Sequence, residues 1–298
     1  MRIVEDFETT RPFEVLAPAR QRIPFVFDSP HSGTSYPRAF LAASRLDARR
    51  IRRSEDAFVD QLFAGVVELG APLMRAHFPR AYLDVNREPY ELDPKMFAGR
   101  LPPYANVRSV RVAGGLGTIA RVVSEAEEIY AAPLDVAAAL DRIDALYKPY
   151  HAALRRLLSR TREGFGYAVL IDCHSMPSNV RASETRHRAD FVVGDRYGTS
   201  CARALTERCA EFLRALGYSV SLNKPYAGGF ITEHYGQPAK GVHALQVEVN
   251  RGLYMDEGTF APSAGFERVA RDLGQLVAVL SELPRALFTG EPEAEAAE

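Results

Sequence analysis

The sequence predicts an α/β protein: a single-domain, three-layer fold with a central, mostly parallel mixed sheet. Short runs rich in β-branched and aromatic residues alternate with longer segments of helical periodicity, an order typical of such sheets. Of the 298 residues, 47% are hydrophobic and 25% are charged, which excludes a fibrous or disordered protein. No repeat or linker stands out, so we expect one domain over residues 1–290 and a disordered acidic tail over residues 291–298.

In the first half of the chain we expect one helix, three strands and a long loop. The helix follows Ser54, where apolar side chains recur at helical spacing, and it ends at Gly70. Residues 92–117 are rich in proline and glycine, which predicts a long surface loop. The strands are apolar runs at residues 23–28, 71–77 and 81–86.

The second half alternates strands and helices in the same way. A helical pattern over residues 134–160 is expected to break before Pro149, because proline lacks the N–H that an interior helical position donates. Two further helices are expected at 201–216 and 266–283, and strands at 167–172, 191–194, 219–222 and 244–249.

Charge and cysteine usage exclude several classes of protein. The 37 basic and 38 acidic residues give a formal charge of −1, so we expect no nucleic-acid partner and no attraction to an anionic membrane. Three cysteines without a C-x-x-C pair disfavour a disulfide framework and suit a reducing cytoplasm. The acidic first ten residues do not resemble a secretory signal, and no segment approaches the roughly 20 apolar residues of a membrane span. The sequence leaves the oligomeric state open.

Polar residues follow the apolar strands at their carboxyl ends. Open α/β sheets bind ligands at that edge, so these residues are the first candidates for chemistry. Four places share this pattern: Asp28 to Gly33, Asn86 and Arg87, Asp172 to Ser175, and Glu248 to Arg251.

At two of these places, the alternation of side chains along a strand shows which polar residues share a face. Gln246, Glu248 and Asn250 share one face of their predicted strand, where a carboxylate is costly to bury without partners. The alternative is an edge strand whose polar face is solvated. Asp172 and His174 likewise share a face.

Cys173 points the other way from His174 on the same strand. A thiol nucleophile with His174 as its base is therefore disfavoured, and a small buried side chain is the better interpretation of Cys173.

Two histidines at separate strand ends, with acids nearby, match a catalytic zinc site, which uses three N or O ligands and one open position. His31 and His174 are the candidates, although a lone histidine is more often structural. Asp56 is the best third ligand. Its alternative role is a first-turn acid that stabilises a helix dipole, with Ser54 as the cap.

The glycine-rich segment from Gly114 to Thr118 resembles a phosphate-binding loop only loosely. It lacks the G-x-x-x-x-G-K-[ST] pattern, so a flexible active-site loop is favoured over a nucleotide site. Arg121 follows it and is a candidate for binding a substrate carboxylate.

Six short phrases together carry a resemblance to a known family. They are Ser29-Pro30-His31-Ser32-Gly33, Leu83-Asp84-Val85-Asn86-Arg87, Asp172-Cys173-His174-Ser175-Met176-Pro177, Gly194-Asp195-Arg196-Tyr197-Gly198, Gly228-Gly229-Phe230-Ile231-Thr232 and Glu248-Val249-Asn250-Arg251. From about Phe25 to about Met255 the chain resembles the N-formylglutamate amidohydrolase (deformylase) family.

The resemblance implies a zinc-dependent amidase with a carboxypeptidase-like α/β fold. Its expected reaction is the cleavage of N-formyl-L-glutamate to formate and glutamate, the last step of one bacterial route of histidine breakdown. Related zinc carboxypeptidases use a His-x-x-Glu pair, but here Thr34 stands three residues after His31. The carboxylate ligand is therefore left open, with Asp56 as the candidate.

The expected site combines these residues around zinc or another divalent metal. His31, His174 and Asp56 would bind the metal, and Glu248 would move the proton between water and the leaving amine. The substrate is expected to be a small anionic N-acyl amino acid. Its candidate contacts are Arg87, Arg251 and Arg121 for carboxylates, and Asn86 and Tyr254 for orientation. Alternatives are a zinc amidase or peptidase acting on another N-acyl amino acid or peptide, a non-catalytic binding protein and a nucleotide-binding enzyme.

Overall fold

The computed structural model describes residues 1–7, 10–123, 126–178 and 189–289. The tail predicted over residues 291–298 lies outside the described residues. By its contacts the chain divides into two compact units, so the single domain expected over residues 1–290 stays a prediction. Unit 1 comprises Met1–Val15, Ser29–Ala57 and Met74–Arg155, and unit 2 comprises Leu16–Asp28, Phe58–Leu73 and Arg156–Glu298.

A seven-stranded mixed sheet confirms the predicted α/β class. Its strands follow the order β10-β9-β11-β8-β3-β5-β2. β8 runs parallel to both β3 and β11, and β9 is antiparallel to β11. The bounds are β2 Phe13–Leu16, β3 Phe25–Ser29, β5 Leu73–Ala76, β8 Ala168–Met176, β9 Phe191–Gly194, β10 Val220–Leu222 and β11 Val242–Asn250.

The central strands β8 and β11 are buried along almost their whole length. All nine residues of β8 are buried, and only the first residue of β11 is partly exposed. Parallel strands that are covered on both faces read as long apolar runs, which is why both were visible in the sequence. Because β11 lies between β9 and β8, the alternative of an edge strand with a solvated polar face is wrong.

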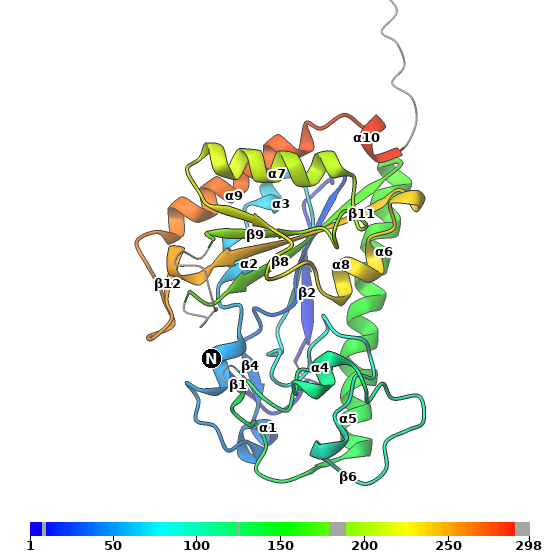
Figure 1. Ribbon diagram of the computed structural model, residues 1–298, viewed down its shortest axis with the longest axis vertical. Helices are drawn as coiled ribbons and strands as arrows, with labels where there is room; N and C mark the ends of the chain where they lie inside the picture. The colour runs from blue at the N-terminus through cyan, green and yellow to red at the C-terminus, as the bar shows by residue number, and fades with distance from the viewer. Residues whose placement is uncertain (8–9, 124–125, 179–188, 290–298) are drawn as a thin grey trace, which may run out of the picture. The chain divides into compact units, whose positions relative to one another are not determined.

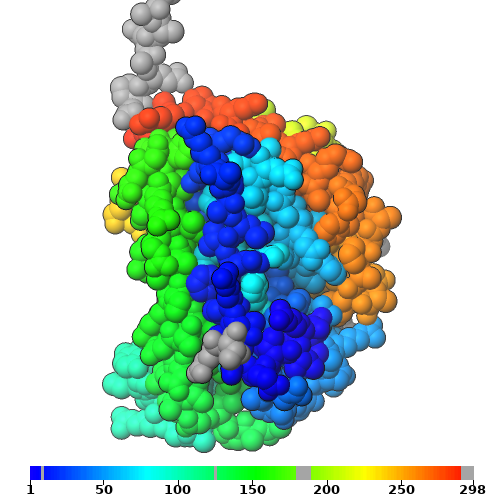
Figure 2. Space-filling view, turned by 180° about the vertical axis from the view of Figure 1, so that it is seen from behind, coloured from blue at the N-terminus to red at the C-terminus, as the bar shows by residue number. Residues whose placement is uncertain are grey.

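β2, in contrast, is an edge strand of the sheet, and its four residues are all partly exposed. Figure 2 shows the N-terminal segment, in dark blue, at the surface of the molecule.

Helices cover both faces of the central strands in unit 2. α9 (Phe266–Ser281) packs against α7 (Arg203–Ala215), α2 (Val59–Leu62) and α3 (Val66–Leu69), while α8 (Phe230–Tyr235) packs on β8 and β11. In Figure 1, α7 and α9 lie on one side of β8, β9 and β11, and α8 lies on the other. The α8 side carries the polar side chains of the two central strands, since Thr232 of α8 contacts Asp172 and Gln246.

The remaining elements are short, apart from one long helical segment. They are β1 Arg2–Val4, β4 Ser35–Pro37, α1 Arg38–Ala43, η1 Ile51–Ser54, η2 Pro94–Met96, β6 Phe97–Ala98, α4 Val110–Ala113, β7 Leu134–Asp135, η5 Pro238–Lys240, η6 Arg251–Leu253, β12 Met255–Asp256, β13 Ala261–Pro262 and α10 Ala286–Thr289. η2, β6 and α4 lie inside the long loop expected over residues 92–117. In the described part of the chain, no helix combines the length and apolarity needed to cross a bilayer.

The long segment confirms the helix expected over residues 134–160 and extends it. α5 (Val136–Arg142), the π-helical η4 (Ile143–Tyr147) and α6 (Lys148–Phe165) follow one another directly. The break expected before Pro149 therefore takes the form of a wider π turn rather than an end of the helix.

The strand predicted at residues 81–86 is wrong. This segment forms turns, in which the N–H groups of Tyr82 and Leu83 both donate to the carbonyl of Pro79, at 2.9 and 3.2 Å. Its apolar residues Ala81, Leu83 and Val85 are buried, so the apolar run that suggested a strand reports burial and not pairing with a neighbouring strand.

The helix predicted to follow Ser54 is also corrected. The structure has two short helices, α2 and α3, and the cap of α2 is Phe58, which has a left-handed φ of 67° and makes no side-chain cap hydrogen bond. Ser54 instead ends η1, and Asp56 precedes α2. Asp56 is therefore not the first-turn acid of a helix capped by Ser54. Gly70 does end α3, as predicted, in a left-handed conformation.

A substitution at Gly33 tests how tightly the backbone is packed after β3. An alanine Cβ there would lie 2.0 Å from the carbonyl oxygen of Phe78, so Gly33→Ala should lower the free energy of unfolding by about 1–3 kcal/mol. At Gly164 in α6 no atom lies within 4 Å, and Gly164→Ala should raise it by about 0.5–1 kcal/mol. Urea unfolding measures both values, and equal stability of the two variants would contradict the close approach at Gly33.

Candidate metal centre

The sheet register places two histidine-bearing segments at one edge. Asp28 at the end of β3 is opposite Asp172 of β8, and the two strands are parallel. His31 follows three residues after Asp28, and His174 two residues after Asp172. The chain therefore leaves both strands with a histidine near the carboxyl edge, where α/β sheets bind ligands.

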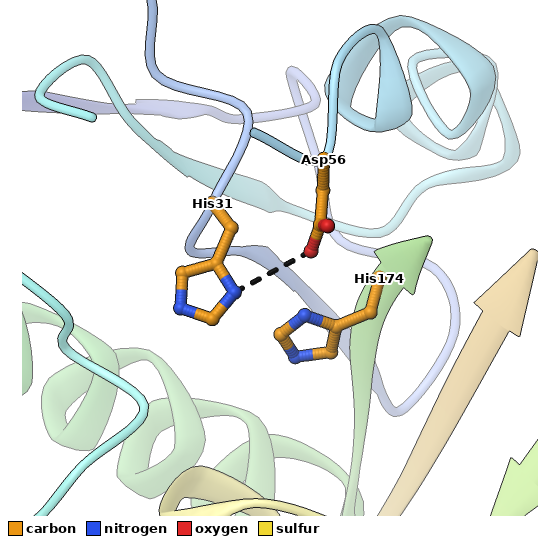
Figure 3. A group of neighbouring side chains, drawn as sticks. All are labelled: His31, Asp56 and His174. Carbon is orange, nitrogen blue, oxygen red and sulfur yellow. Dashed lines mark ion pairs between the residues drawn. The ribbon is translucent and has the colours of Figure 1, made fainter. Parts of the chain in front are cut away.

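His31, Asp56 and His174 form a buried group that can hold a metal ion. Each side chain offers one ligand atom, and these atoms lie within 4.8 Å of one another. Figure 3 shows the three side chains pointing toward a common centre. Nδ1 of His31 lies 3.4 Å from Oδ2 of Asp56. The backbone ties the same two residues together, because the Asp56 N–H donates to the His31 carbonyl at 3.0 Å.

Each imidazole is held from its other side by a second carboxylate. Nε2 of His31 lies 2.7 Å from Oδ1 of Asp84, and Nε2 of His174 lies 2.7 Å from Oδ1 of Asp172. These contacts direct Nδ1 of both rings toward the centre of the group. A carboxylate on the outer nitrogen fixes the tautomer and orientation of a metal-binding histidine.

Asp84 is a buried acid that keeps its charge. Burial alone would raise the pKa of its carboxyl, but nearby positive charges, above all that of Arg87, hold the pKa well below its usual range. Arg80 adds an ion pair at 2.8 Å from Oδ2. Asp84 is thus an ionised partner for His31 over the whole physiological range of pH.

The donor set fits a divalent metal of the zinc type. Two imidazole nitrogens and one carboxylate oxygen are the ligands of many hydrolytic zinc sites. Ligand atoms at about 2.0–2.1 Å from one ion in a tetrahedron are separated by about 3.3–3.4 Å. The distance of 3.4 Å between His31 Nδ1 and Asp56 Oδ2 matches that separation.

Glu248 lies on the strand next to His174. It is directly opposite His174 in the register of β11 and β8, and it is 6% exposed. Its Oε1 accepts a hydrogen bond of 2.8 Å from the amide of Gln246, two residues earlier on the same face. The structure therefore brings the predicted base and a predicted metal ligand side by side.

Arg251 is buried at the end of β11, as expected for a strand-end residue. Its Nε donates to the hydroxyl of Ser175 at 3.0 Å, and its Nη1 lies 3.9 Å from Glu257. Tyr254 is fully buried and its ring packs edge-on against Phe266, so the structure places it in the core.

Asn86 and Arg87 belong to the turns that follow Asp84. The Asn86 N–H donates to Oδ1 of Asp84 at 2.8 Å, and Nε of Arg87 donates to the Leu116 carbonyl at 2.8 Å. Burial lowers the pKa of Arg87. Both residues therefore shape the segment that carries Asp84.

Arg121 lies elsewhere, in ion pairs with Asp93 at 2.7 Å and Glu128 at 3.3 Å. It lines a cavity of about 180 Å³, and none of the described residues around that cavity is a candidate metal ligand. Gly114 ends α4 and Gly115 follows it with a φ of 74°, so this glycine-rich segment does not lead from a strand into a helix.

Sequence reasoning missed the role of Asp84 because its segment was predicted as a strand. The Asp-x-His spacing of Asp172 and His174 on one strand was the available signal for the other carboxylate. Residues two apart on a strand share one face, so this spacing alone places the Asp172 carboxylate beside the His174 ring.

The cysteines offer no nucleophile. All three are buried, and burial raises the pKa of Cys173 well above its ordinary value and those of Cys201 and Cys209 to about 12. The interpretation of Cys173 as a small buried side chain is confirmed.

Thiol labelling tests this assignment. A pKa of about 12 in place of 9.0 lowers the thiolate fraction at pH 8 about a thousandfold, so iodoacetamide should label the folded protein far more slowly than the urea-unfolded chain. Mass spectrometry counts the labelled sites. Rapid labelling of Cys173 in the folded protein would restore the thiol mechanism.

Comparison with known proteins shows which family the chain is similar to. A family model described as N-formylglutamate amidohydrolase matches residues 23–255. The chain is 33% identical over 250 residues to an N-formylglutamate deformylase of Pseudomonas putida, covering 82% of this chain and 86% of the relative. It is 32% identical over 279 residues to an N-formylglutamate deformylase of Pseudomonas aeruginosa, covering 92% and 96%.

A solved structure is similar over almost the whole chain. The crystal structure of N-formylglutamate amidohydrolase from Ralstonia eutropha JMP134 superposes with a TM-score of 0.86 at 38% identity. The match covers 92% of this chain and 98% of that one. The gene product Atu2144 from Agrobacterium tumefaciens shares the fold, with a TM-score of 0.63 at 18% identity.

Proposed function

The chain belongs to the N-formylglutamate amidohydrolase family, and from this premise we propose that it hydrolyses N-formyl-L-glutamate to formate and L-glutamate with the help of a bound zinc ion. The observation that supports a bound metal is the convergence of ligand atoms of His31, Asp56 and His174 within 4.8 Å of one another. We further propose that the reaction takes place in the cytoplasm, as the last step of histidine breakdown.

His31, Asp56 and His174 would hold the ion. When bound, a divalent metal polarises a carbonyl and makes water more acidic, which is the chemistry that amide hydrolysis needs. Asp84 and Asp172 each accept the Nε2–H of one imidazole, so both rings keep the tautomer that presents Nδ1 as a ligand.

Glu248 is the proposed general base and acid. As a carboxylate it takes a proton from the attacking water, and it then delivers that proton to the nitrogen of the departing glutamate. Its place opposite His174 and its burial support this role, since a carboxylate shielded from solvent transfers a proton to the reactants rather than to bulk water.

Arg251 and Arg87 are the proposed contacts for the carboxylates of the substrate. A guanidinium binds a carboxylate through two parallel hydrogen bonds, which a lysine cannot do. Arg251 follows Glu248 by three residues, and Arg87 follows Asp84 by three. We assign no substrate contact to Arg121, because, among the described residues, the cavity that it lines is bordered by none of the candidate metal ligands.

Metal content and formate release together test the proposed function. The purified protein should contain about one zinc per chain and should release formate from N-formylglutamate faster than from N-acetylglutamate or N-formylaspartate. His174→Ala should lose the metal, whereas Glu248→Gln should keep it and lose about 10²–10⁴-fold in kcat. Formate release by a metal-free protein, or full activity of Glu248→Gln, would contradict the proposal.

The second carboxylates can be tested by metal affinity alone. Asp84→Asn should weaken zinc binding about 10–100-fold in competition with a chelator, because His31 loses its orienting partner. Asp47→Asn, a change at an exposed carboxylate that caps a turn, is the matched control and should leave the affinity unchanged. Circular dichroism establishes that both variants are folded. Unchanged affinity of folded Asp84→Asn would remove Asp84 from the account.

A further inference from the structure

We propose that Thr232 and Gln246 are positioning residues: Thr232 holds the metal ligand His174 through Asp172, and Gln246 holds the base Glu248, with both residues fixed at the same short helix, α8. The inference rests on the proposed function of His174 and Glu248. Neither Thr232 nor Gln246 touches the reacting atoms. Both act by fixing the groups that do.

The contacts of Thr232 and Gln246 lie within unit 2 and meet between the two side chains. Nε2 of His174 contacts Oδ1 of Asp172 at 2.7 Å, and the Thr232 hydroxyl lies 3.0 Å from Oδ2 of the same carboxylate. That hydroxyl is also 3.4 Å from Oε1 of Gln246, whose Nε2 donates to Oε1 of Glu248 at 2.8 Å. Two hydrogen bonds thus run from His174 to Thr232 and one from Gln246 to Glu248, and the two groups are in contact at the Thr232 hydroxyl and the Gln246 oxygen.

A backbone contact fixes which way the Gln246 amide faces. Its Oε1 accepts the N–H of Gly229, the residue before α8, at 2.7 Å. A flipped amide would set its NH2 against that N–H and its oxygen against the Glu248 carboxylate, so both contacts would become repulsive. The Gln246 side chain thus presents its N–H donor, and not its oxygen, to Oε1 of Glu248.

Thr232 has one hydroxyl proton, and the geometry indicates where it goes. The carboxylate of Asp172 is nearer than the Gln246 oxygen and, being charged, is the stronger acceptor. Thr232 therefore donates to Asp172 and holds the carboxylate whose other oxygen orients His174.

Burial makes these contacts rigid. Thr232 and Asp172 are 0% exposed and Gln246 is 4% exposed, so water does not replace a lost partner. The short helix α8 supplies both fixed points, the Gly229 N–H and the Thr232 hydroxyl. This helix packs over the polar face of β8 and β11.

The two positions give different signatures when they are changed. Gln246→Met removes the donor to Glu248, and we expect kcat to fall about 10–100-fold with KM and zinc affinity unchanged. Thr232→Val keeps the shape but removes the hydroxyl, and we expect zinc affinity to fall about tenfold, whereas Thr232→Ser should restore it. Chelator competition measures the affinity independently of turnover.

Gln21→Met is the matched control. This part-buried amide donates to Thr161 and to two backbone carbonyls away from α8, so its loss should lower the melting temperature without changing kcat. If Gln246→Met behaves like Gln21→Met, its role is structural and the inference fails. If Thr232→Val binds zinc as tightly as the wild type, Thr232 does not position His174 through Asp172, and that part of the inference fails.

The outcome is separable from failure of the proposed function. Wild-type protein that releases no formate would refute the function, whatever the Gln246 and Thr232 variants do. Active wild type, inactive Glu248→Gln and fully active Gln246→Met would refute only the positioning. Where Gln246→Met is unfolded by circular dichroism, Gln246→Glu takes its place, and its added carboxylate should lower kcat in the same way.

Discussion

A buried carboxylate needs a positive charge or hydrogen-bond donors, and the whole candidate site is arranged to meet that need. Asp56, Asp84, Asp172 and Glu248 are each at most 6% exposed. Moving each such charge out of water costs several kcal/mol. The two histidines, Arg80, Arg87, a backbone N–H, a threonine and a glutamine amide compensate them. The proposed cation adds the largest positive charge at the point where His31, Asp56 and His174 converge.

The sheet makes this arrangement possible because it fixes positions to within a residue. β8 and β11 are parallel and in register, so Asp172 faces Gln246 and His174 faces Glu248. Strand alternation then turns all four side chains toward α8, while Cys173 and Val247 face the opposite, apolar side. Shifting either strand by one residue would exchange the two sets. The register is thus as important to the chemistry as the identity of the residues.

Strand alternation is also the reason why much of the site was visible in the sequence. It grouped Asp172 with His174 and Gln246 with Glu248, and the structure has both pairs in hydrogen-bond contact. The apolar runs likewise predicted the central strands, since both faces of these strands are covered.

The predictions that proved wrong concern segments whose local sequence pattern does not determine which residues they contact in the folded protein. Residues 81–86, predicted as a strand, form mostly buried turns, so the position of Asp84 against His31 was hidden. The apolar spacing after Ser54 predicted one helix, but Phe58 adopts a left-handed φ and the helix is divided. The partners of Arg121, Asp93 and Glu128, come from segments before and after it that no sequence period relates to it.

X-ray absorption at the zinc edge of stoichiometrically loaded protein tests the central claim most directly. The account predicts a first shell of nitrogen and oxygen at about 2.0–2.1 Å, with the multiple-scattering pattern of two imidazoles. In the His31→Ala variant one imidazole should disappear from that pattern. A sulfur shell near about 2.3 Å, or a zinc spectrum unchanged by the loss of His31, would contradict it.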